Sequence, residues 1–306
     1  MKQCSYEVDD RTRFVCYYHL VDIYVHKKYF AMKAIFPDDK KIEYPEQSIL
    51  TIYLSSEKIS FSLYEPGKKG SFFYNELTPE NHTDPFSIFK DTFFDHAFFY
   101  LPFKKVWVMS CTPVFTFVPD LVYKEDLRED FMHFMFPENR GITLNHSIPS
   151  LGINVLYRLS TDVYSFMLRS FNEPEFIHYS SPLITYFLEK VKTSDISRMV
   201  VNLKEKGLDI FCFSGKTFLL GNYFPCNDLA EAVYYILFTW KQLQFNQLKD
   251  YLHIAGNAAF KDELINKLTP YLDNIYSLSI FPEIHLEGVE TNKVPFELAA
   301  LSLCEL

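Results

Sequence analysis

The tripeptide Gly215-Lys216-Thr217 has the residue types that end a phosphate-binding loop, and such a loop would make this chain a nucleotide enzyme. The loop needs a glycine, four residues and then Gly-Lys-Ser/Thr between a strand and a helix, so that backbone N–H groups can surround a phosphate. Here the residue five positions before Gly215 is Ile210, which lies inside an apolar run, and a second apolar run begins at Thr217. Ser214-Gly215 between two strand-like runs is typical of a tight turn. We therefore predict a β-hairpin at this position, with no nucleotide bound to it.

The other residue types that carry out chemistry lack the spacing that the chemistry needs. The nine histidines form no H-E-x-x-H motif, the chain has no G-x-S-x-G motif, and the six cysteines form no C-x-x-C pair. His178 and His253 lie in strand-like runs, which favours structural histidines over metal ligands. Cys111 and Cys212 lie in apolar strands, where burial raises the pKa of a thiol and lowers its reactivity. The sequence therefore supports no catalytic residue and no metal site.

Composition narrows the class of protein. The chain has 306 residues with 18% aromatic side chains, enough apolar area for one bilobal or two modest domains. Its net charge of −9 argues against a nucleic-acid partner, because binding to the phosphate backbone needs clustered Lys and Arg. The most apolar stretch, residues 97–118, is interrupted by Lys104, Lys105 and two prolines, so we expect no membrane span. Scattered cysteines and the lack of a signal-peptide pattern indicate a cytoplasmic protein.

A pattern of three strands, a helix and a strand occurs twice, which indicates an internal duplication. The first copy has strands at residues 49–54, 59–64 and 71–76, a helix that begins at Asp84-Pro85, and a strand at residues 105–110. The second copy has strands at residues 199–203, 208–213 and 217–223, a helix that begins near Asn227 or Asp228, and a strand at residues 250–255. Asp is a favoured N-cap, and Pro is a favoured first helical residue.

Further elements lie between the two copies and after the second. Strands are predicted at residues 114–118, 154–159, 175–179 and 275–280, and helices at residues 124–135, 162–171, 182–191 and 258–268. The duplication places the first half at residues 32–195, with an inserted α/β segment near residues 113–150, and the second half at residues 196–306. Residues 1–31 lack a clear period and are expected to be a dispensable extension, with the alternative that the native chain starts later. No Gly/Ser-rich linker separates the halves, so we expect them to pack closely.

This order of elements resembles the actin-like ATPase fold, in which two ribonuclease-H-like halves face each other across a cleft. The chain is also similar to an uncharacterised bacterial family, a domain of unknown function assigned to that fold. The similarity extends from about residue 33 onward and rests on five stretches: FTFVP at residues 115–119, NVLY at 154–157, HYSSPLI at 178–184, LLGNYFPCNDLAEAVYYILFTWKQL at 219–243, and LSLCEL at 301–306. The resemblance implies an α/β fold with two halves, each a three-strand meander followed by alternating helices and strands, and no established activity.

The resemblance also implies where a nucleotide would lie. In actin-like ATPases the first hairpin turn of each half holds phosphates through backbone N–H groups, and an Asp in each half positions magnesium and water. The corresponding first turn here, Ser55-Ser56-Glu57-Lys58, has no glycine, and neither residues 49–54 nor residues 199–203 contain an Asp. Glu57 would repel a phosphate by about 1–4 kcal/mol at 4 Å. This turn has therefore lost the phosphate-binding pattern.

The other two elements of the implied nucleotide site persist in reduced form. The second turn retains Lys206 and Gly207, and the loop that would receive adenosine retains Gly256-Asn257 before a helix, whose N-terminus favours an anion. The alternatives are a solvated hairpin for Lys206 and Gly207 and an ordinary strand-to-helix turn for Gly256. The candidate cleft or ligand-binding residues are Ser55, Ser56, Glu57, Lys206, Gly207, Gly256 and Asn257.

Two functions follow from these observations. The leading hypothesis is a non-catalytic actin-like binding or scaffold protein with degenerate nucleotide-binding turns, a protein partner and no cofactor. The alternative is an enzyme, an ATPase or an ATP-dependent small-molecule kinase that uses ATP and magnesium. The enzyme needs aspartates from unexpected loops, such as Asp120 or Asp228, to reach the cleft. Convergence of Glu57, Lys206 and Gly256 with an aspartate nearby would favour the enzyme.

Overall fold

A computed structural model describes residues 42, 44–77, 84–190, 196–256, 260–279 and 294–304. The predicted extension at residues 1–31 and the candidate residue Asn257 lie outside the described residues. Within the described ranges, no helix combines the length and the apolar character that are needed to cross a membrane.

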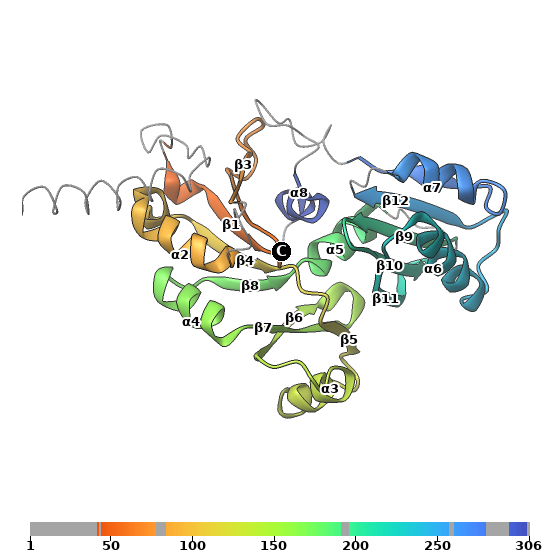
Figure 1. Ribbon diagram of the computed structural model, residues 1–306, viewed down its shortest axis with the longest axis horizontal. Coiled ribbons are helices and arrows are strands. Elements are labelled where there is room, and N and C mark those ends of the chain that lie inside the picture. The colour runs from red at the N-terminus through yellow and green to blue at the C-terminus, as the bar shows by residue number, and fades with distance from the viewer. Residues whose placement is uncertain are drawn as a thin grey trace, which may run out of the picture.

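The first half is built on a five-stranded sheet with the order β3-β2-β1-β4-β8 (Figure 1). Its strands are β1 (Ile49–Leu54), β2 (Ile59–Tyr64), β3 (Phe73–Leu77), β4 (Lys105–Ser110) and β8 (Glu175–His178). The first three form the predicted antiparallel meander, and β4 and β8 add parallel strands to β1. Helices α2 (Pro85–Asp95) and α4 (Thr161–Ser170), with the 3-10 turn η3 (Ala97–Tyr100), pack aromatic side chains on one face of this sheet. The side chain of Asp84 accepts a hydrogen bond from the Ser87 N–H, which confirms the predicted N-cap.

The second half repeats this plan with the order β11-β10-β9-β12-β13. Its strands are β9 (Ser197–Lys204), β10 (Gly207–Ser214), β11 (Thr217–Pro225), β12 (Tyr251–Gly256) and β13 (Ile275–Ser277). Helices α6 (Leu229–Gln242) and α7 (Lys261–Leu268) cover its outer face. Strands β10 and β11 pair antiparallel with Ser214 opposite Thr217, so Gly215-Lys216 is the turn between them. The predicted hairpin is therefore confirmed, and the sequence there is no phosphate-binding loop.

A third sheet, with the order β5-β7-β6, lies within the first half. It consists of β5 (Phe115–Pro119), β6 (Ile142–Ile148) and β7 (Ile153–Leu159), with α3 (Arg128–Met135) and the 3-10 turns η4 (Glu125–Leu127) and η5 (Pro149–Leu151) in its connections. The sequence analysis missed β6, and it placed β7 after the insertion. The sheet extends to Leu159, past the predicted insertion near residues 113–150. The sequence did not indicate this extent, because local alternation does not reveal the sheet to which a strand belongs.

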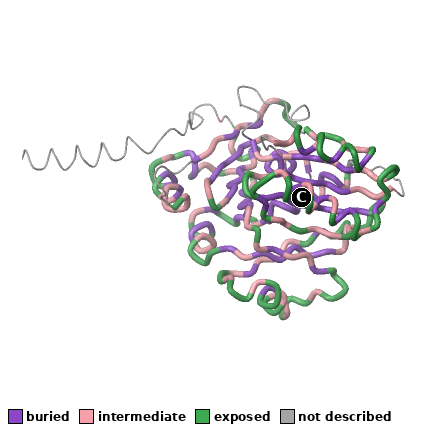
Figure 2. Tube along the Cα trace, turned by 45° about the vertical axis from the view of Figure 1, so that its right-hand side comes forward, coloured by how far each residue is buried: buried purple, intermediate pink, exposed green. Residues whose placement is uncertain are grey.

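The two halves meet around a pair of central helices, α5 (Ser180–Lys190) and α8 (Phe296–Leu303), which lie between the large sheets (Figure 1). The rings of Phe187 on α5 and Phe296 on α8 stack with centroids 5.7 Å apart. One core cluster joins side chains from β1, β4, β10, α5 and α8, so it spans both halves. The buried stretches accordingly run through the middle of the molecule in Figure 2. The remaining element, the 3-10 turn η2 (Pro45–Gln47), precedes β1.

Candidate functional site in the cleft between the halves

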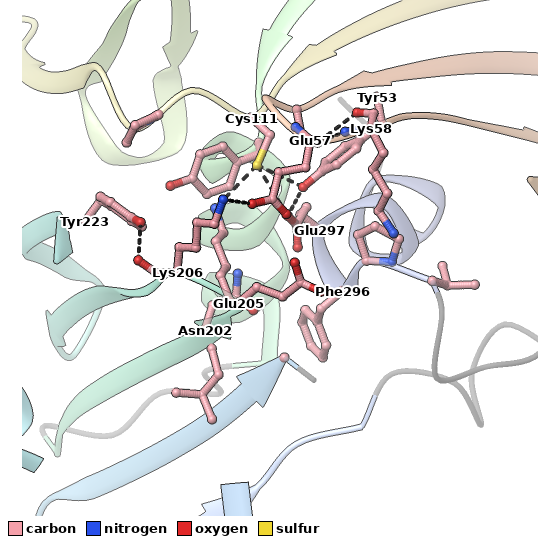
Figure 3. A pocket seen from close by; sticks show the side chains of 18 of the residues that line it. Tyr53, Glu57, Lys58, Cys111, Asn202, Glu205, Lys206, Tyr223, Phe296 and Glu297 are labelled. Atoms are coloured by element: carbon pink, nitrogen blue, oxygen red, sulfur yellow. Dashed lines mark hydrogen bonds and ion pairs between the residues drawn. The ribbon is translucent and has the colours of Figure 1, made fainter. Parts of the chain in front are cut away.

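A pocket of about 780 Å³ opens between the β1–β2 turn of the first half and the β9–β10 turn of the second half (Figure 3). Five of the candidate residues predicted from the sequence line it, namely Ser55, Ser56, Glu57, Lys206 and Gly256. Gly207 is not among the lining residues, although it immediately follows Lys206. The turns that were predicted to face each other across a cleft therefore do so.

The Ser55 side chain satisfies two backbone N–H groups of the first turn. Ser55 Oγ accepts hydrogen bonds from the N–H groups of Lys58, at 3.1 Å, and Glu57, at 3.4 Å, and it donates to the carbonyl of Lys58 at 2.8 Å. In a phosphate-binding turn these N–H groups point at the ligand. Here they point at a serine side chain of the same turn, which leaves them unavailable to a phosphate.

An ion pair joins the two turns to each other across the pocket. The carboxylate of Glu57 contacts Lys206 Nζ (Figure 3). Hydrogen bonds from Lys206 and from Glu205 hold the pKa of Glu57 below its ordinary value, and the shared bond with Glu57 raises the pKa of Glu205. We call these three side chains, Glu57, Glu205 and Lys206, the clasp. The clasp occupies the space between the two turns.

The two candidate glycines have structural reasons to be glycine. Gly256 has a φ of +83°, and a Cβ there would lie 2.2 Å from the carbonyl oxygen of Leu203 on the neighbouring strand β9. A Cβ on Gly207 would lie 2.5 Å from the hydroxyl of Tyr223. Contacts this short force the backbone to move, so strand packing alone accounts for both residues.

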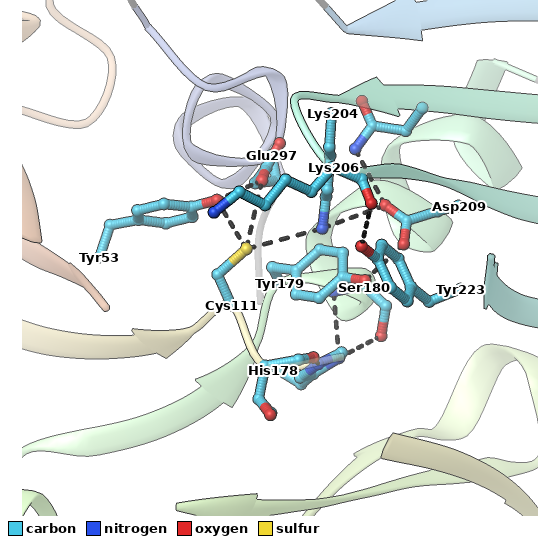
Figure 4. A network of polar contacts seen from close by, with 12 residues as sticks. Tyr53, Cys111, His178, Tyr179, Ser180, Lys204, Lys206, Asp209, Tyr223 and Glu297 are labelled. Atoms are coloured by element: carbon cyan, nitrogen blue, oxygen red, sulfur yellow. Dashed lines mark hydrogen bonds and ion pairs between the residues drawn. The ribbon is translucent and has the colours of Figure 1, made fainter. Parts of the chain in front are cut away.

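A buried group of charges lies beside the pocket (Figure 4). Asp209 on β10 is fully buried, and its carboxylate accepts hydrogen bonds from the Tyr179 hydroxyl at 2.5 Å and from Asn202 Nδ2 at 3.2 Å. Lys204 Nζ lies 3.2 Å from the second oxygen of Asp209 and 3.1 Å from the centre of the Tyr179 ring. Asp209 is therefore paired and hydrogen-bonded on both oxygens.

The charged side chains in this group shift one another's pKa values. Burial lowers the pKa of Lys204, but the negative charges around it, chiefly that of Asp209, outweigh this effect and hold the pKa above its ordinary value. Burial raises the pKa of Asp209, against the opposing effects of Lys204 and Tyr179. Lys204 thus stays an ammonium ion.

Cys111, Tyr53 and Glu297 also line the pocket and belong to the same polar network as Lys204 (Figure 4). The Tyr53 hydroxyl lies 2.5 Å from Glu297 Oε1 and 2.9 Å from Cys111 Sγ, and Lys204 Nζ lies 3.6 Å from the same sulfur. Burial raises the pKa of Cys111 to about 11, so the thiol is protonated at neutral pH. Burial also raises the pKa of Cys212. The predicted low reactivity of both thiols agrees with these directions.

The aspartates that the enzyme hypothesis would need are used elsewhere. Asp120 accepts a hydrogen bond from Asn154 Nδ2 at 2.5 Å in the inserted sheet, and Asp228 caps α6 by accepting from the Glu231 N–H at 2.9 Å. Neither lines the pocket. In the part of the chain that the structure describes, no cluster of His, Cys, Asp and Glu has the arrangement of a metal site.

The two histidines that the sequence analysis singled out are structural. His178 is fully buried, with Nδ1 2.7 Å from Ser180 Oγ and Nε2 3.0 Å from the carbonyl of Thr112. The ring of His253 stacks on Tyr276 with centroids 5.5 Å apart. Neither lines the pocket.

Buried histidines make the fold sensitive to acid. Burial lowers the pKa of His178 to about 3 and the pKa values of His146 and His253 to about 4. An unfolded chain binds protons at these residues near pH 6.5, whereas the folded chain does not, so stability is present above pH 6.5 and is lost as the pH falls. We expect His178 alone to lower the free energy of unfolding by about 2 kcal/mol at pH 5 relative to pH 7. Urea denaturation of the wild type and His178→Gln at both pH values measures this, and an equally steep loss in the variant would contradict it.

Two large sheets with a duplicated plan, facing each other across a central pocket, define a protein of the actin-like ATPase fold. Residues 37–275 match the sequence profile of DUF3822, described as a protein of unknown function, and the chain belongs to this family. No curated protein matches the chain. The predicted fold and family are thereby confirmed, and the family carries no established function.

Solved structures agree with this assignment. The chain is 25% identical to a Bacteroides thetaiotaomicron protein described as having an actin-like ATPase fold and unknown function, with a TM-score of 0.75 over 87% of this chain and 99% of that one. It is also similar in fold to a chain of the PilM-PilN type IV pilus biogenesis complex, with 10% identity and a TM-score of 0.51 over 83% of this chain and 97% of that one.

Proposed function

We propose that this protein is a non-catalytic binding protein of the actin-like fold, whose cleft no longer holds nucleotide phosphates. The clasp carries the proposal. Glu57 of the first turn is paired with Lys206 of the second, at the place where the resemblance puts the phosphates. A phosphate entering there would have to displace Lys206 from Glu57 and would then face the carboxylates of Glu57 and Glu205.

Two further features support a loss of nucleotide chemistry. The first turn offers Ser55 Oγ in place of a ligand to the N–H groups of Glu57 and Lys58. The aspartate near these turns, Asp209, is fully buried and bound to Lys204, and it would need to leave that ammonium to hold magnesium. The fold thus keeps the cleft between the halves, while the polar groups that line the cleft form hydrogen bonds and ion pairs with one another.

A protein is the partner that we propose. The PilM-PilN complex supports this, because it pairs a protein of the same fold with a second protein in an assembly. The net charge of −9 favours a partner other than nucleic acid. The protonated, unpaired thiols of Cys111 and Cys212 suit a reducing compartment such as the cytoplasm, which is the location that we propose.

Calorimetry with magnesium-ATP tests the proposal. We expect binding weaker than about 1 mM, which corresponds to less than roughly 4 kcal/mol, and no measurable hydrolysis. Lys206→Ala opens the clasp, and the matched control Lys216→Ala changes an exposed lysine in the β10–β11 turn. Both variants should behave like the wild type toward ATP.

Micromolar, magnesium-dependent ATP binding that is lost in Lys206→Ala and kept in Lys216→Ala would overturn the proposal and favour the ATPase or kinase alternative. Gly256→Asp is a poor probe of the cleft, because any side chain at that position collides with the backbone of Leu203. A loss of binding in that variant would report a damaged strand rather than a lost ligand contact.

A further inference from the structure

Glu297 is a largely buried residue that has one carboxylate oxygen without a hydrogen-bond partner among the described residues. It lies in the first turn of α8, is 4% exposed and lines the pocket. Its Oε1 accepts the hydrogen bond from Tyr53, whose pKa is raised by burial and by the nearby Cys111 and Glu297, so the tyrosine keeps its proton and donates it. No described residue gives Oε2 a hydrogen bond, and no described Lys or Arg forms an ion pair with Glu297.

The buried charges around the pocket do not balance. Asp209 and Glu297 are two acids with exposed fractions of 0% and 4%, whereas Lys204 is the cation next to them, with a side chain that is 19% exposed. Lys204 lies within ion-pair distance of Asp209 and not of Glu297. The charge of Glu297 acts on Lys204 only at longer range, so a cation bound directly at Glu297 would stabilise this carboxylate further.

The walls beside Glu297 suit an organic cation. The aromatic side chains of Tyr53, Tyr179 and Phe296 line the pocket, and aromatic faces attract ammonium groups. Lys204 already places its own ammonium over the Tyr179 ring, at 3.1 Å from the ring centre. The volume of about 780 Å³ leaves room for a second cationic group (Figure 3).

Two of the rim lysines oppose a cation only weakly, because a carboxylate compensates the charge of each. Lys58 pairs with Glu76 at 2.5 Å, and Lys206 pairs with Glu57. Lys261 lies 3.4 Å and 3.3 Å from the carbonyl oxygens of Gly256 and Leu278. A carboxylate or phosphate at the base of the pocket would instead meet Glu297 directly.

We propose that the pocket binds an organic ammonium group, which donates to Glu297 Oε2 and packs against Tyr53 and Phe296. This inference rests on the proposed function, because a nucleotide phosphate and an ammonium ion call for opposite charges in one pocket. The group comes either from a free amine or from a lysine side chain of the protein partner, and the two sources share the same chemistry.

The test uses the full chain and pairs of probes that differ only in charge. Calorimetry compares n-butylamine with n-butanol for a free amine, and N-acetyl-lysine amide with N-acetyl-norleucine amide for a protein-borne lysine. We expect each cationic probe to bind at least about tenfold more tightly than its neutral counterpart. The tighter of the two cationic probes identifies the source.

Variants assign the binding to Glu297. Glu297→Gln should weaken the cationic probe at least about 30-fold, because it removes a buried charge partner. Tyr53→Phe keeps the ring but loses the hydroxyl that orients Oε1, so it should weaken binding less than Glu297→Gln does. The matched control Glu263→Gln changes an exposed acid on α7 and should have no effect.

The wild-type measurements decide the inference even where a variant fails to fold. If neither cationic probe exceeds its neutral counterpart at concentrations up to about 10 mM, or if Glu297→Gln binds the cation as well as the wild type does, the ammonium site is wrong. A parallel titration with magnesium-ATP separates the two proposals. ATP binding at micromolar concentration would overturn the proposed function. If neither ATP nor the amines bind measurably, only the ammonium site is overturned.

Discussion

Asp209→Ala should lower the free energy of unfolding by about 3–5 kcal/mol, which is the usual effect of removing one partner from a buried ion pair. The substitution leaves Lys204 as a buried ammonium next to a protonated thiol and an aromatic ring. It also leaves the Tyr179 hydroxyl and Asn202 Nδ2 without their acceptor. The effect should lie toward the lower end of the range, because the Lys204 side chain is 19% exposed and gains some hydration. Urea denaturation followed by circular dichroism measures the change.

A double-mutant cycle separates the ion pair from the loss of packing. Asp209→Ala combined with Lys204→Met removes both charges, so the double variant should be more stable than Asp209→Ala alone by at least about 1 kcal/mol. Asp262→Ala, at an exposed position on α7, should unfold at the wild-type urea concentration. Additive effects of the two substitutions would show that Asp209 and Lys204 do not stabilise each other.

The duplicated core was readable from sequence because its signals are local. The hairpin at Gly215-Lys216 depends on a two-residue turn between apolar runs, and the starts of α2 and α6 depend on single capping aspartates. Each of these signals lies within a few residues of the structure that it predicts. Helix α8 had no such signal, because its short run, Phe296–Leu303, lacks a side-chain cap and is apolar almost all round. It forms where α5 and both sheets cover it.

The site was only partly readable, because its important contacts join distant residues. The resemblance indicated the two turns, and these turns do line one pocket. The ion pair between Glu57 and Lys206 could not be predicted, because it depends on the distance between the two halves in the folded protein. Tyr53 and Glu297 are 244 residues apart, and no local pattern relates them. Asp209 could have been predicted as part of the site. It is a single acid inside the apolar run of residues 208–213, which indicates a buried charge that needs a partner.

Polar groups on facing elements join the two halves on either side of the pocket. Tyr179 follows β8 in the first half, whereas Asp209 and Lys204 belong to the second half. The hydroxyl of Tyr53 on β1 donates a hydrogen bond to Glu297 on α8, so the last described helix is connected to the first strand of the other half. These contacts hold the two sheets in place relative to each other.

Trp240→Ala should lower the free energy of unfolding by about 3–5 kcal/mol, the typical effect of removing a buried Trp side chain. Trp240 lies on α6, is 3% exposed and packs edge to face on Phe245 with ring centroids 5.4 Å apart. Its cluster includes Leu264 and Leu268 of α7, so the cavity would open between two helices that cover the same sheet.

The neighbouring residue provides the control for this prediction. Lys241 is exposed on the same turn of α6, so Lys241→Ala should unfold close to the wild-type urea concentration. Circular dichroism is the suitable probe, because the chain has only two tryptophans and the variant removes one of them. Trp240→Phe should recover part of the loss, since it keeps an aromatic ring and removes an indole N–H that has no hydrogen-bond partner in the described structure. Equal midpoints for Trp240→Ala and Lys241→Ala would mean that α6 presents a different face to the sheet, and the packing of the second half would have to be revised.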